Sequence, residues 1–443
     1  MRRDSVQTAT AIAEQVSAIA LTRPTGLYWW AGFSVSLALL LLLAIAIGTL
    51  FIAGIGIWGV DMPVAWGLAI VDYVWWIAIA SGGTLISAIF YLLGSEWRTP
   101  ITRIAESMMV FAAACAGLFP ILHLGRPWLF FWLFPYPATM QVWPQFRSPL
   151  LWDFVAILVY VIASVLFWYL GLLPDLATLR DRAPSRFAQF CYGLAALGWR
   201  GSAQHWRHYR VLYLLFAGLL TPTVVSIHSI VGLDFAAGMT PGWHSTEFPP
   251  FFVFGAMLSG FGMVTALVIV IRRFYGLANL ITPYHLDILA MMLLASSVAI
   301  GYAYAMEVFA ELYSADAFHH HTAMARLIGP FAPFFWATVL LNVCVPQLLW
   351  SRVLRRAPVP LFIICIAVMI GMWIERYLLV VTSLAQDFMP SAFGSYWPTF
   401  WDWATTLGSF GLFFTGIFLF LRFLPIVAMS EMSAMRREWE KRA

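Results

Sequence analysis

Three ionisable side chains, His123, Asp153 and Asp234, lie near the ends of three different apolar stretches of the sequence. An ionisable group is costly in an apolar medium, so such residues are rare in membrane-spanning segments and usually mark binding sites or ion pathways. An imidazole and a partly desolvated carboxyl group can both exchange protons near neutral pH. These residue types therefore suit proton abstraction from a substrate that is bound among apolar side chains.

The composition identifies the surroundings of these residues as a membrane. Of the 443 residues, 62% are apolar, 17% aromatic and 10% charged, whereas a soluble domain is about 45–50% apolar and about 25% charged. The stretch from Trp29 to Val60 carries no charge and exceeds the roughly 20 residues that cross a bilayer. This composition excludes a soluble enzyme, a disordered chain and a nucleic-acid-binding protein.

Ten apolar stretches can each span the bilayer, which predicts an all-α integral membrane protein. Of the 25 Lys and Arg residues, 21 fall on one side of these spans and three on the other. Because cytoplasmic loops carry the excess of positive charge, both termini are predicted to be cytoplasmic. The predicted spans are residues 28–60, 66–94, 101–131, 149–173, 210–235, 250–274, 285–314, 328–351, 358–385 and 402–427.

The spans divide the chain into a cytoplasmic tail of residues 1–27, a transmembrane domain of residues 28–427 and a second cytoplasmic tail of residues 428–443. We expect residues 6–20 to form an interfacial helix. The basic connection 174–210 is expected to lie along the cytoplasmic membrane surface as short helices.

Helical rise places the three candidate residues at one depth. His123 follows the cytoplasmic Arg103 by 20 residues, or about 30 Å of helix, which puts it close to the outer surface. Asp153 begins the next span and Asp234 ends the span after it, and both of these span ends lie on the outer side. Three different helices therefore bring an imidazole or a carboxyl group to a similar level.

Oxidation of a quinol is the chemistry that fits this layer. A quinol loses two electrons and two protons, so each hydroxyl group needs a nearby base, while apolar walls hold the ring and tail. We expect His123, Asp153 and Asp234 to be these bases. The residues expected to bind the headgroup around them are Arg126, Trp128, His228 and Asp72. The alternative is that each residue caps a helix or satisfies a buried partner.

A second set of ionisable residues lies deeper in the spans. Glu375 and Arg376 lie near the middle of the ninth span, where an unpaired charge is least tolerated. Such residues are either steps of a proton path towards the cytoplasm or purely structural ion pairs, and both explanations stay open. The candidates for the path are Glu106, Glu307, Glu375, Arg376, Ser81 and Tyr302, with Thr84 and Tyr304 as further hydroxyl relays.

We expect no redox centre and no metal site in this chain. The four cysteines form no CxxC pair, and His123 and His228 differ in depth, so neither an iron–sulfur cluster nor a haem is expected. The run His319 to His321 lies beside Asp316, but three adjacent histidines cannot all face one ion.

The outward-facing loops are rich in Trp, Pro, Tyr and Phe. Aromatic residues at this level form the belt found at membrane surfaces, but stiff, proline-containing loops also suit the docking of a partner protein. Both interpretations stay open for residues 132–137, 143–147 and 396–401.

Several motifs resemble the NrfD/polysulfide-reductase membrane-subunit family. They are His123-Leu-Gly-Arg-Pro-Trp128, Pro135-Tyr-Pro137 and the segment from Trp143 to Asp153. Residues 171–183, 241–250 and 373–384 resemble one branch in particular, the larger quinol-binding NrfD-like subunit of bacterial alternative complex III. The similarity runs from about Tyr28 to Trp397.

The resemblance implies ten helices, arranged as two four-helix bundles with two peripheral helices, in the bacterial cytoplasmic (inner) membrane. It implies oxidation of menaquinol or ubiquinol near the periplasmic face, in a respiratory or photosynthetic chain and with possible proton translocation. Electrons would pass to a periplasmic iron–sulfur, molybdopterin-like subunit.

The implied complex also contains a second NrfD-like membrane subunit, multihaem cytochrome c subunits and membrane lipids, and this chain would not be active alone. The family's site residues match at His123, Asp153 and Asp234. Many relatives carry Gly-His-Ala-Gly-Thr where this chain has Ala80-Ser-Gly-Gly-Thr84, so a histidine of the second span is missing here.

Two other functions compete with quinol oxidation. One is that of the sibling NrfD-like subunit, acting as a structural anchor or proton-translocating module without bound quinone. The other is a secondary transporter, whose helices would be unwound near the midplane. The candidate break for a transporter is Thr221-Pro222-Thr223.

Overall fold

The computed structural model describes residues 9–133 and 146–442, and every regular element within these ranges is helical. Ten segments are long and apolar enough to cross a membrane, which confirms the predicted number. In chain order they are Leu27–Ala53 (α2), Leu68–Leu92, Thr102–Leu122 (α5), Pro149–Arg182 (α6), Ala203–Ala236 (α8), Phe248–Tyr275 (α9), Pro283–Tyr313 (α10), Ala332–Trp350, Pro358–Ala385 and Phe400–Phe423 (α16).

Three of the ten segments contain a π-helical turn, a local widening that is frequent near functional sites. The second segment consists of α3 (Leu68–Thr84), a π-helical turn at Leu85–Ile89 and α4 (Phe90–Leu92). The eighth begins as α12 (Ala332–Val339) and widens at Leu340–Cys344. The ninth consists of α14 (Pro358–Tyr377), a turn at Leu378–Thr382 and α15 (Ser383–Ala385).

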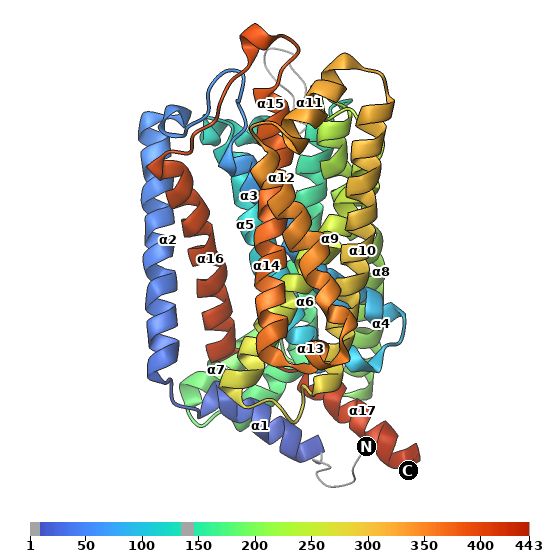
Figure 1. Ribbon diagram of the computed structural model, residues 1–443. Coiled ribbons are helices and arrows are strands. Elements are labelled where there is room, and N and C mark those ends of the chain that lie inside the picture. Colours follow the sequence, from blue (N-terminus) through green and yellow to red (C-terminus); the bar gives the residue numbers. More distant parts are fainter. Residues whose placement is uncertain (1–8, 134–145, 443) are drawn as a thin grey trace.

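Eight of the spans form two four-helix bundles. In the first bundle, α3 packs on α5, α5 on α6 and α6 on α8. In the second, α9 packs on α10 and α14, and α12 packs on α14. The contact of α3 with α9 joins the bundles, and α2 and α16 pack together at the side (Figure 1). This is the expected arrangement of two bundles with two peripheral helices.

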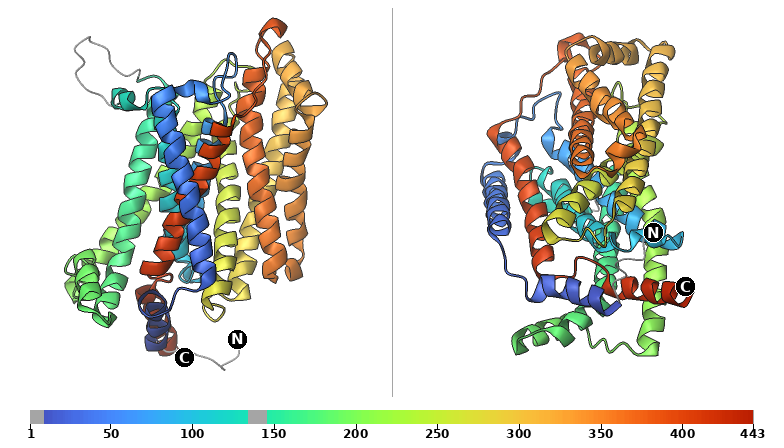
Figure 2. Two further views of the ribbon diagram at one scale, coloured as in Figure 1. Left: turned by 90° about the vertical axis from the view of Figure 1, so that its left-hand side faces the viewer. Right: turned by 60° about the horizontal axis from the view of Figure 1, so that its bottom comes forward.

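Short helices mark the cytoplasmic end of the molecule. Figures 1 and 2 show α1 (Ala9–Leu21), α7 (Arg186–Ala195) and α17 (Met429–Arg442) at one end, and α11 (Ala317–Leu327) at the other. The arginine-rich connections lie at the end with α1, α7 and α17, so the excess of positive charge predicts that this end is cytoplasmic. The helix expected within residues 6–20 corresponds to α1. The connection expected at 174–210 is shorter than predicted, because α6 continues to Arg182 and α8 begins at Ala203, and α7 is the short helix between them.

Several helix ends differ from the predicted ones, because hydropathy alone does not mark where the backbone turns. The first span ends at Ala53 rather than residue 60, since Gly54 adopts a φ of 80° that favours glycine. The third span ends at Leu122 rather than residue 131, and Gly125, with a φ of 74°, turns the chain into the short helix Pro127–Leu133.

A buried ionic network holds the cytoplasmic end of the first bundle together. The guanidinium of Arg103 on α5 lies 2.6 Å from Glu106 and 3.3 Å from Asp175 on α6, and all three side chains are inaccessible to solvent. Arg103 also donates a hydrogen bond to the carbonyl group of Gly171. A Cβ atom at position 171 would collide with this guanidinium, so only glycine lets α6 approach so closely.

The close approach at Gly171 predicts a clear effect of one added methyl group. Gly171→Ala should lower the free energy of unfolding by about 1–3 kcal/mol, because the buried Arg103 is held by Glu106 and Asp175 and cannot shift without loosening these ion pairs. Gly218→Ala on α8 is the control, since a Cβ atom there meets nothing within 4 Å. The measurement is thermal unfolding of both variants in detergent. Equal transition temperatures for Gly171→Ala and the native chain would contradict the packing described here.

Candidate functional site

The outer end of the first bundle contains a buried carboxyl group bonded to a tyrosine. Asp153 lies on the first turns of α6, and its Oδ2 atom accepts a hydrogen bond from the hydroxyl group of Tyr73 on α3. Both side chains are buried. The other oxygen of Asp153, Oδ1, is also buried but has no hydrogen-bond partner among the described residues. The Oδ1 atom of Asp153 is thus available to accept a hydrogen bond.

Asp234 joins this pair from a third helix. It lies near the outer end of α8, and its charge acts directly on both Asp153 and Tyr73. Its Oδ1 atom is likewise buried and unpartnered within the described part of the chain. The structure therefore brings together two of the three predicted bases. It adds Tyr73, which the sequence reasoning missed because its neighbour Asp72 had drawn attention instead.

The other buried carboxylates of the spans have their charge or their oxygens satisfied. Asp72 and Asp402 have hydrogen-bond donors on both oxygens. The rest pair with arginines: Glu106 and Asp175 with Arg103, Glu311 with Arg326, Glu375 with Arg376, and Asp287 with Arg355. Among the buried carboxylates of residues 9–133 and 146–435, Asp153 is the exception, with neither a cation nor two occupied oxygens.

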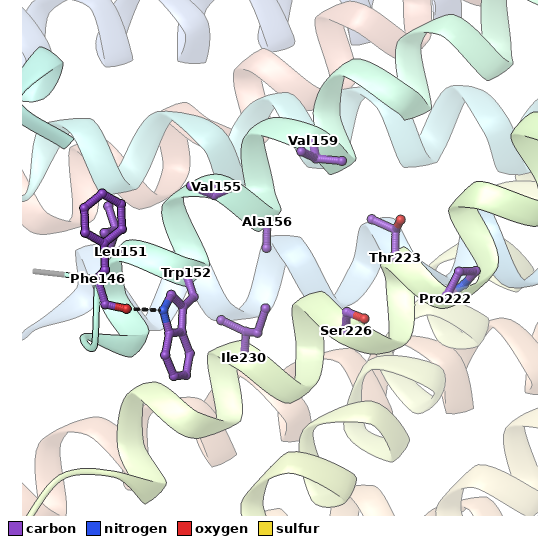
Figure 3. A pocket seen from close by; sticks show the side chains of 10 residues that line it. All are labelled: Phe146, Leu151, Trp152, Val155, Ala156, Val159, Pro222, Thr223, Ser226 and Ile230. Carbon is purple, nitrogen blue, oxygen red and sulfur yellow. Dashed lines mark hydrogen bonds between the residues drawn. The ribbon is translucent and has the colours of Figure 1, made fainter. Parts of the chain in front are cut away.

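An apolar groove of about 450 Å³ lies between α6 and α8, the two helices that carry the aspartates (Figure 3). Trp152 and Val155 line it from α6, and Pro222, Ser226 and Ile230 line it from α8. Trp152 and Val155 are 42% and 47% exposed, so the groove opens towards the bilayer rather than into the bundle. Its size and lining suit a ring and the first part of an isoprenoid tail.

Neither aspartate lines the groove, but both are close along the chain to residues that do. Asp153 directly follows the lining residue Trp152, and Asp234 lies four residues beyond Ile230. Four residues correspond to about 6 Å of rise on the same face of a helix. The indole nitrogen of Trp152 donates to the carbonyl group of Phe146 at 2.7 Å and so holds the outer rim of the groove in place.

His123, the third predicted base, lies in the outer layer but is not bonded to the aspartates. It ends α5 and is partly buried, and its Nδ1 atom lies 3.3 Å from the carbonyl oxygen of Phe119 in its own helix. No hydrogen bond or ion pair joins it to Asp153 or Asp234 within the described ranges. Arg126 is exposed, and the Trp128 ring is half exposed, with its centroid 5.9 Å from that of Phe51 on α2.

Asp72 and His228, expected near the headgroup, contact other elements. The oxygens of Asp72 accept hydrogen bonds from Trp373 at 2.9 Å and Thr406 at 2.5 Å. Asp72 therefore ties α3 to α14 and α16 and has no oxygen left over for a substrate. His228 is buried and faces the charge of Arg376, at the contact between the two bundles. Neither residue belongs to the carboxyl pair.

Part of the predicted proton path lies in the second bundle. The Tyr304 hydroxyl group donates to Glu375 at 3.0 Å, and Arg376 lies 2.9 Å from the same carboxylate. Glu307 pairs with Arg326 at 2.9 Å. Glu307 and Glu375 face one small cavity of about 20 Å³, which has room for a water molecule. This group of residues leads from the bundle interior towards the outer surface.

The remaining members of the predicted path lie elsewhere. Glu106 belongs to the Arg103 network at the cytoplasmic end of the first bundle. The hydroxyl group of Ser81 donates to the carbonyl groups of Ala78 and Ala256 and serves the crossing of α3 and α9. Tyr302 is 68% exposed on the outside of α10. The six residues are therefore not brought together into one path.

The histidine run of the outer loop is part of α11. Asp316 caps this helix through hydrogen bonds from the backbone amides of Phe318 and His319, which hold the pKa of its carboxyl group below the usual value. His321 lies 3.0 Å from the side-chain oxygen of Gln386. No group of three or more potential metal ligands occurs in the described ranges.

Only part of the aromatic loop prediction can be placed. Residues 134–145, which include most of the first two aromatic segments, lie outside the described residues. In the third segment, Trp397 is 79% and Phe400 is 66% exposed on the outer side. Exposed aromatic rings are compatible with both a membrane belt and a docking surface.

The fold and the site define a ten-helix membrane protein with a buried carboxyl pair near its outer face. The chain belongs to the family described as polysulphide reductase, NrfD, whose model matches residues 58–387. It is 26% identical over 417 residues to a protein of Halobacterium salinarum provisionally named as the membrane C subunit of a dimethyl sulfoxide reductase, covering 85% of this chain and 89% of the relative. It is 23% identical over 401 residues to the C subunit of a selenate reductase of Mesobacillus selenatarsenatis, covering 82% and 86%.

Tyr73→Phe tests the geometry of the carboxyl pair. The substitution keeps the ring but leaves Asp153 without its hydrogen-bond donor, so the free energy of unfolding should fall by about 1–3 kcal/mol. Tyr302→Phe is the control, because that side chain is mostly exposed. Chemical denaturation in detergent measures both. A Tyr73→Phe variant as stable as the control would show that Asp153 does not depend on this donor.

Proposed function

We propose that this chain is the quinol-binding and quinol-oxidising membrane subunit of a multi-subunit oxidoreductase. The observation that supports this most is the uncompensated pair of Asp153 and Asp234 beside a groove that opens to the bilayer. A proton acceptor of this kind is costly to bury, so its persistence favours a functional role. Lipid-soluble substrates reach the groove from the membrane, while the carboxyl groups stay out of water.

Each residue of the site has its own role in accepting or passing on the quinol protons. Asp234 lies one helical turn beyond the groove residue Ile230 on α8 and would accept the first proton from a quinol hydroxyl group. Asp153, held by Tyr73, would accept the second through its free oxygen. Ionising both carboxyl groups at once is unfavourable in so apolar a site, so the pair takes up one proton at a time, and the first proton must be passed on before the second is accepted. His123, at the same level, would pass protons on or bond a ring oxygen.

The two electrons of the oxidation would leave through a partner protein on the outer side. The relatives are named as C subunits of a dimethyl sulfoxide reductase and a selenate reductase. In general terms, we therefore propose that this chain is a membrane subunit of such a reductase complex. More specifically, we propose that it is the quinol-oxidising NrfD-like subunit of an alternative complex III. This more specific proposal draws on the motifs at 171–183, 241–250 and 373–384.

An alternative complex III would supply specific partner subunits. They are a periplasmic iron–sulfur, molybdopterin-like subunit, a second NrfD-like membrane subunit and multihaem cytochrome c subunits, in a bacterial inner membrane with menaquinol or ubiquinol as substrate. This chain would have no activity alone, because the electron acceptor belongs to the partner.

One observation favours a second candidate function, that of a proton-translocating module. The residues Glu375, Tyr304, Glu307 and Arg326 surround a cavity in the second bundle and could carry protons outward. A transporter receives less support, because α8 continues as a helix from Ala203 to Ala236 through the predicted break at Pro222.

Asparagine substitutions of the two aspartates test quinol oxidation directly. In the assembled complex, Asp153→Asn and Asp234→Asn should each lower the rate of quinol oxidation by about 10²-fold or more, as loss of a proton acceptor does. Asp61→Asn is the control, because Asp61 is an exposed carboxylate of an outer loop.

The outcome separates the candidate functions. Steady-state turnover with a quinol analogue is the measurement, with inhibition by a quinone analogue as a second reading. If both variants keep native turnover and native inhibition, the site is not where quinol is oxidised, and the anchor or proton-translocating role takes its place.

A further inference from the structure

A polar cavity of about 270 Å³ lies at the cytoplasmic end of the molecule, at the opposite end of the first bundle from the aspartate pair. It is enclosed by α1, the end of α6, the connection before α8, and α17. Its polar and aromatic lining includes Thr178, Arg180, Asp181, Trp199, Arg200 and Trp206. None of these residues has a part in the proposed quinol chemistry.

The charge of the cavity is positive. Arg180 is fixed by two contacts, a hydrogen bond from Nη1 to the carbonyl oxygen of Trp199 at 3.0 Å and an ion pair with Asp181 at 2.8 Å. Arg200 is exposed, and its side chain forms no ion pair within the described part of the chain. Asp181 balances Arg180, so the charge of Arg200 stays uncompensated. An anion is the ligand that this lining recognises.

The cavity lies at the level of the lipid headgroups. α6 has 34 residues, or about 51 Å of helix, whereas the hydrocarbon core is about 30 Å thick. Because α6 begins at the outer rim, its last residues, Pro174 to Arg182, reach the cytoplasmic headgroup region. Trp199 and Trp206 pack edge to face with ring centroids 5.1 Å apart, and tryptophan is typical of this interface.

The neighbouring helix α7 presents an apolar face that nothing in the described chain covers. Phe187, Phe190 and Leu194 are each 69–78% exposed and recur every three or four residues, and Leu197, just beyond the end of the helix, is 70% exposed. Figure 2 shows α7 beside the base of the bundle, at the cytoplasmic end. An amphipathic helix in this position, among arginines, lies in the membrane surface with its apolar face among acyl chains.

We propose that the cavity and α7 together form a binding site for an anionic phospholipid of the cytoplasmic leaflet. The phosphate group binds to Arg200 and Arg180 in the cavity, and the acyl chains lie along the apolar face of α7. The charge of the lining, its depth and the adjacent apolar helix face each match one part of such a lipid. Free inorganic phosphate would use only the first of these features.

The test is the amount of phospholipid that the purified chain retains. Native mass spectrometry after exchange into mixed phosphatidylglycerol and phosphatidylcholine micelles should show phosphatidylglycerol bound preferentially. Arg200→Ala should lower this binding about fivefold, the typical effect of one basic residue near an anionic membrane surface. Arg273→Ala removes another exposed cytoplasmic arginine that forms no ion pair among the described residues, and it should leave binding unchanged.

Two further experiments distinguish lipid binding from the binding of other ligands. Phe190→Gln with Leu194→Gln leaves the arginines intact and should also weaken phosphatidylglycerol binding, whereas inorganic phosphate should not raise the unfolding temperature. The proposal fails if Arg200→Ala and Arg273→Ala retain equal lipid, or if phosphate alone stabilises the chain as the lipid does. It also fails if, in the assembled complex, α7 is covered by another protein and the α7 variant retains native lipid.

Discussion

The burial of Asp153 beside Asp234 is the constraint on which the functional account depends. Two carboxyl groups from different helices meet in an apolar layer, and one tyrosine hydroxyl group, bonded to Asp153, is the hydrogen-bond donor that the described structure supplies to them. Such a pair is unfavourable for folding, because neither charge is compensated. The three helices α3, α6 and α8 must therefore be held in place by other contacts.

Contacts at the opposite end of the same bundle hold two of these helices, α6 and α8. Arg103, Glu106 and Asp175 join α5 and α6 through a hydrogen-bonded ionic network, and Tyr213 on α8 donates to Glu106 at 2.7 Å. Ser430 of α17 covers this network by donating its backbone amide to Asp175. The first bundle is thus fixed at its cytoplasmic end, and its outer end can tolerate an uncompensated site next to a groove open to lipid.

The sequence predicts the depth of a residue in the membrane better than the direction in which its side chain points. The ten spans, the cytoplasmic end and the common level of Asp153 and Asp234 follow from hydropathy, arginine placement and a constant rise per residue. Which way a side chain points depends on the neighbouring helices, which no single-sequence pattern reveals. Asp72 and Tyr73 are adjacent and share a depth, yet Asp72 bonds α14 and α16 while Tyr73 reaches Asp153.

The most direct test of the central claim is the position of the quinone itself. A density map of the assembled complex with a bound quinone analogue should show the headgroup within hydrogen-bonding distance of Asp234 or Asp153, with the tail in the groove between α6 and α8. A headgroup bound in the second bundle, or on a different protein of the complex, would contradict the account.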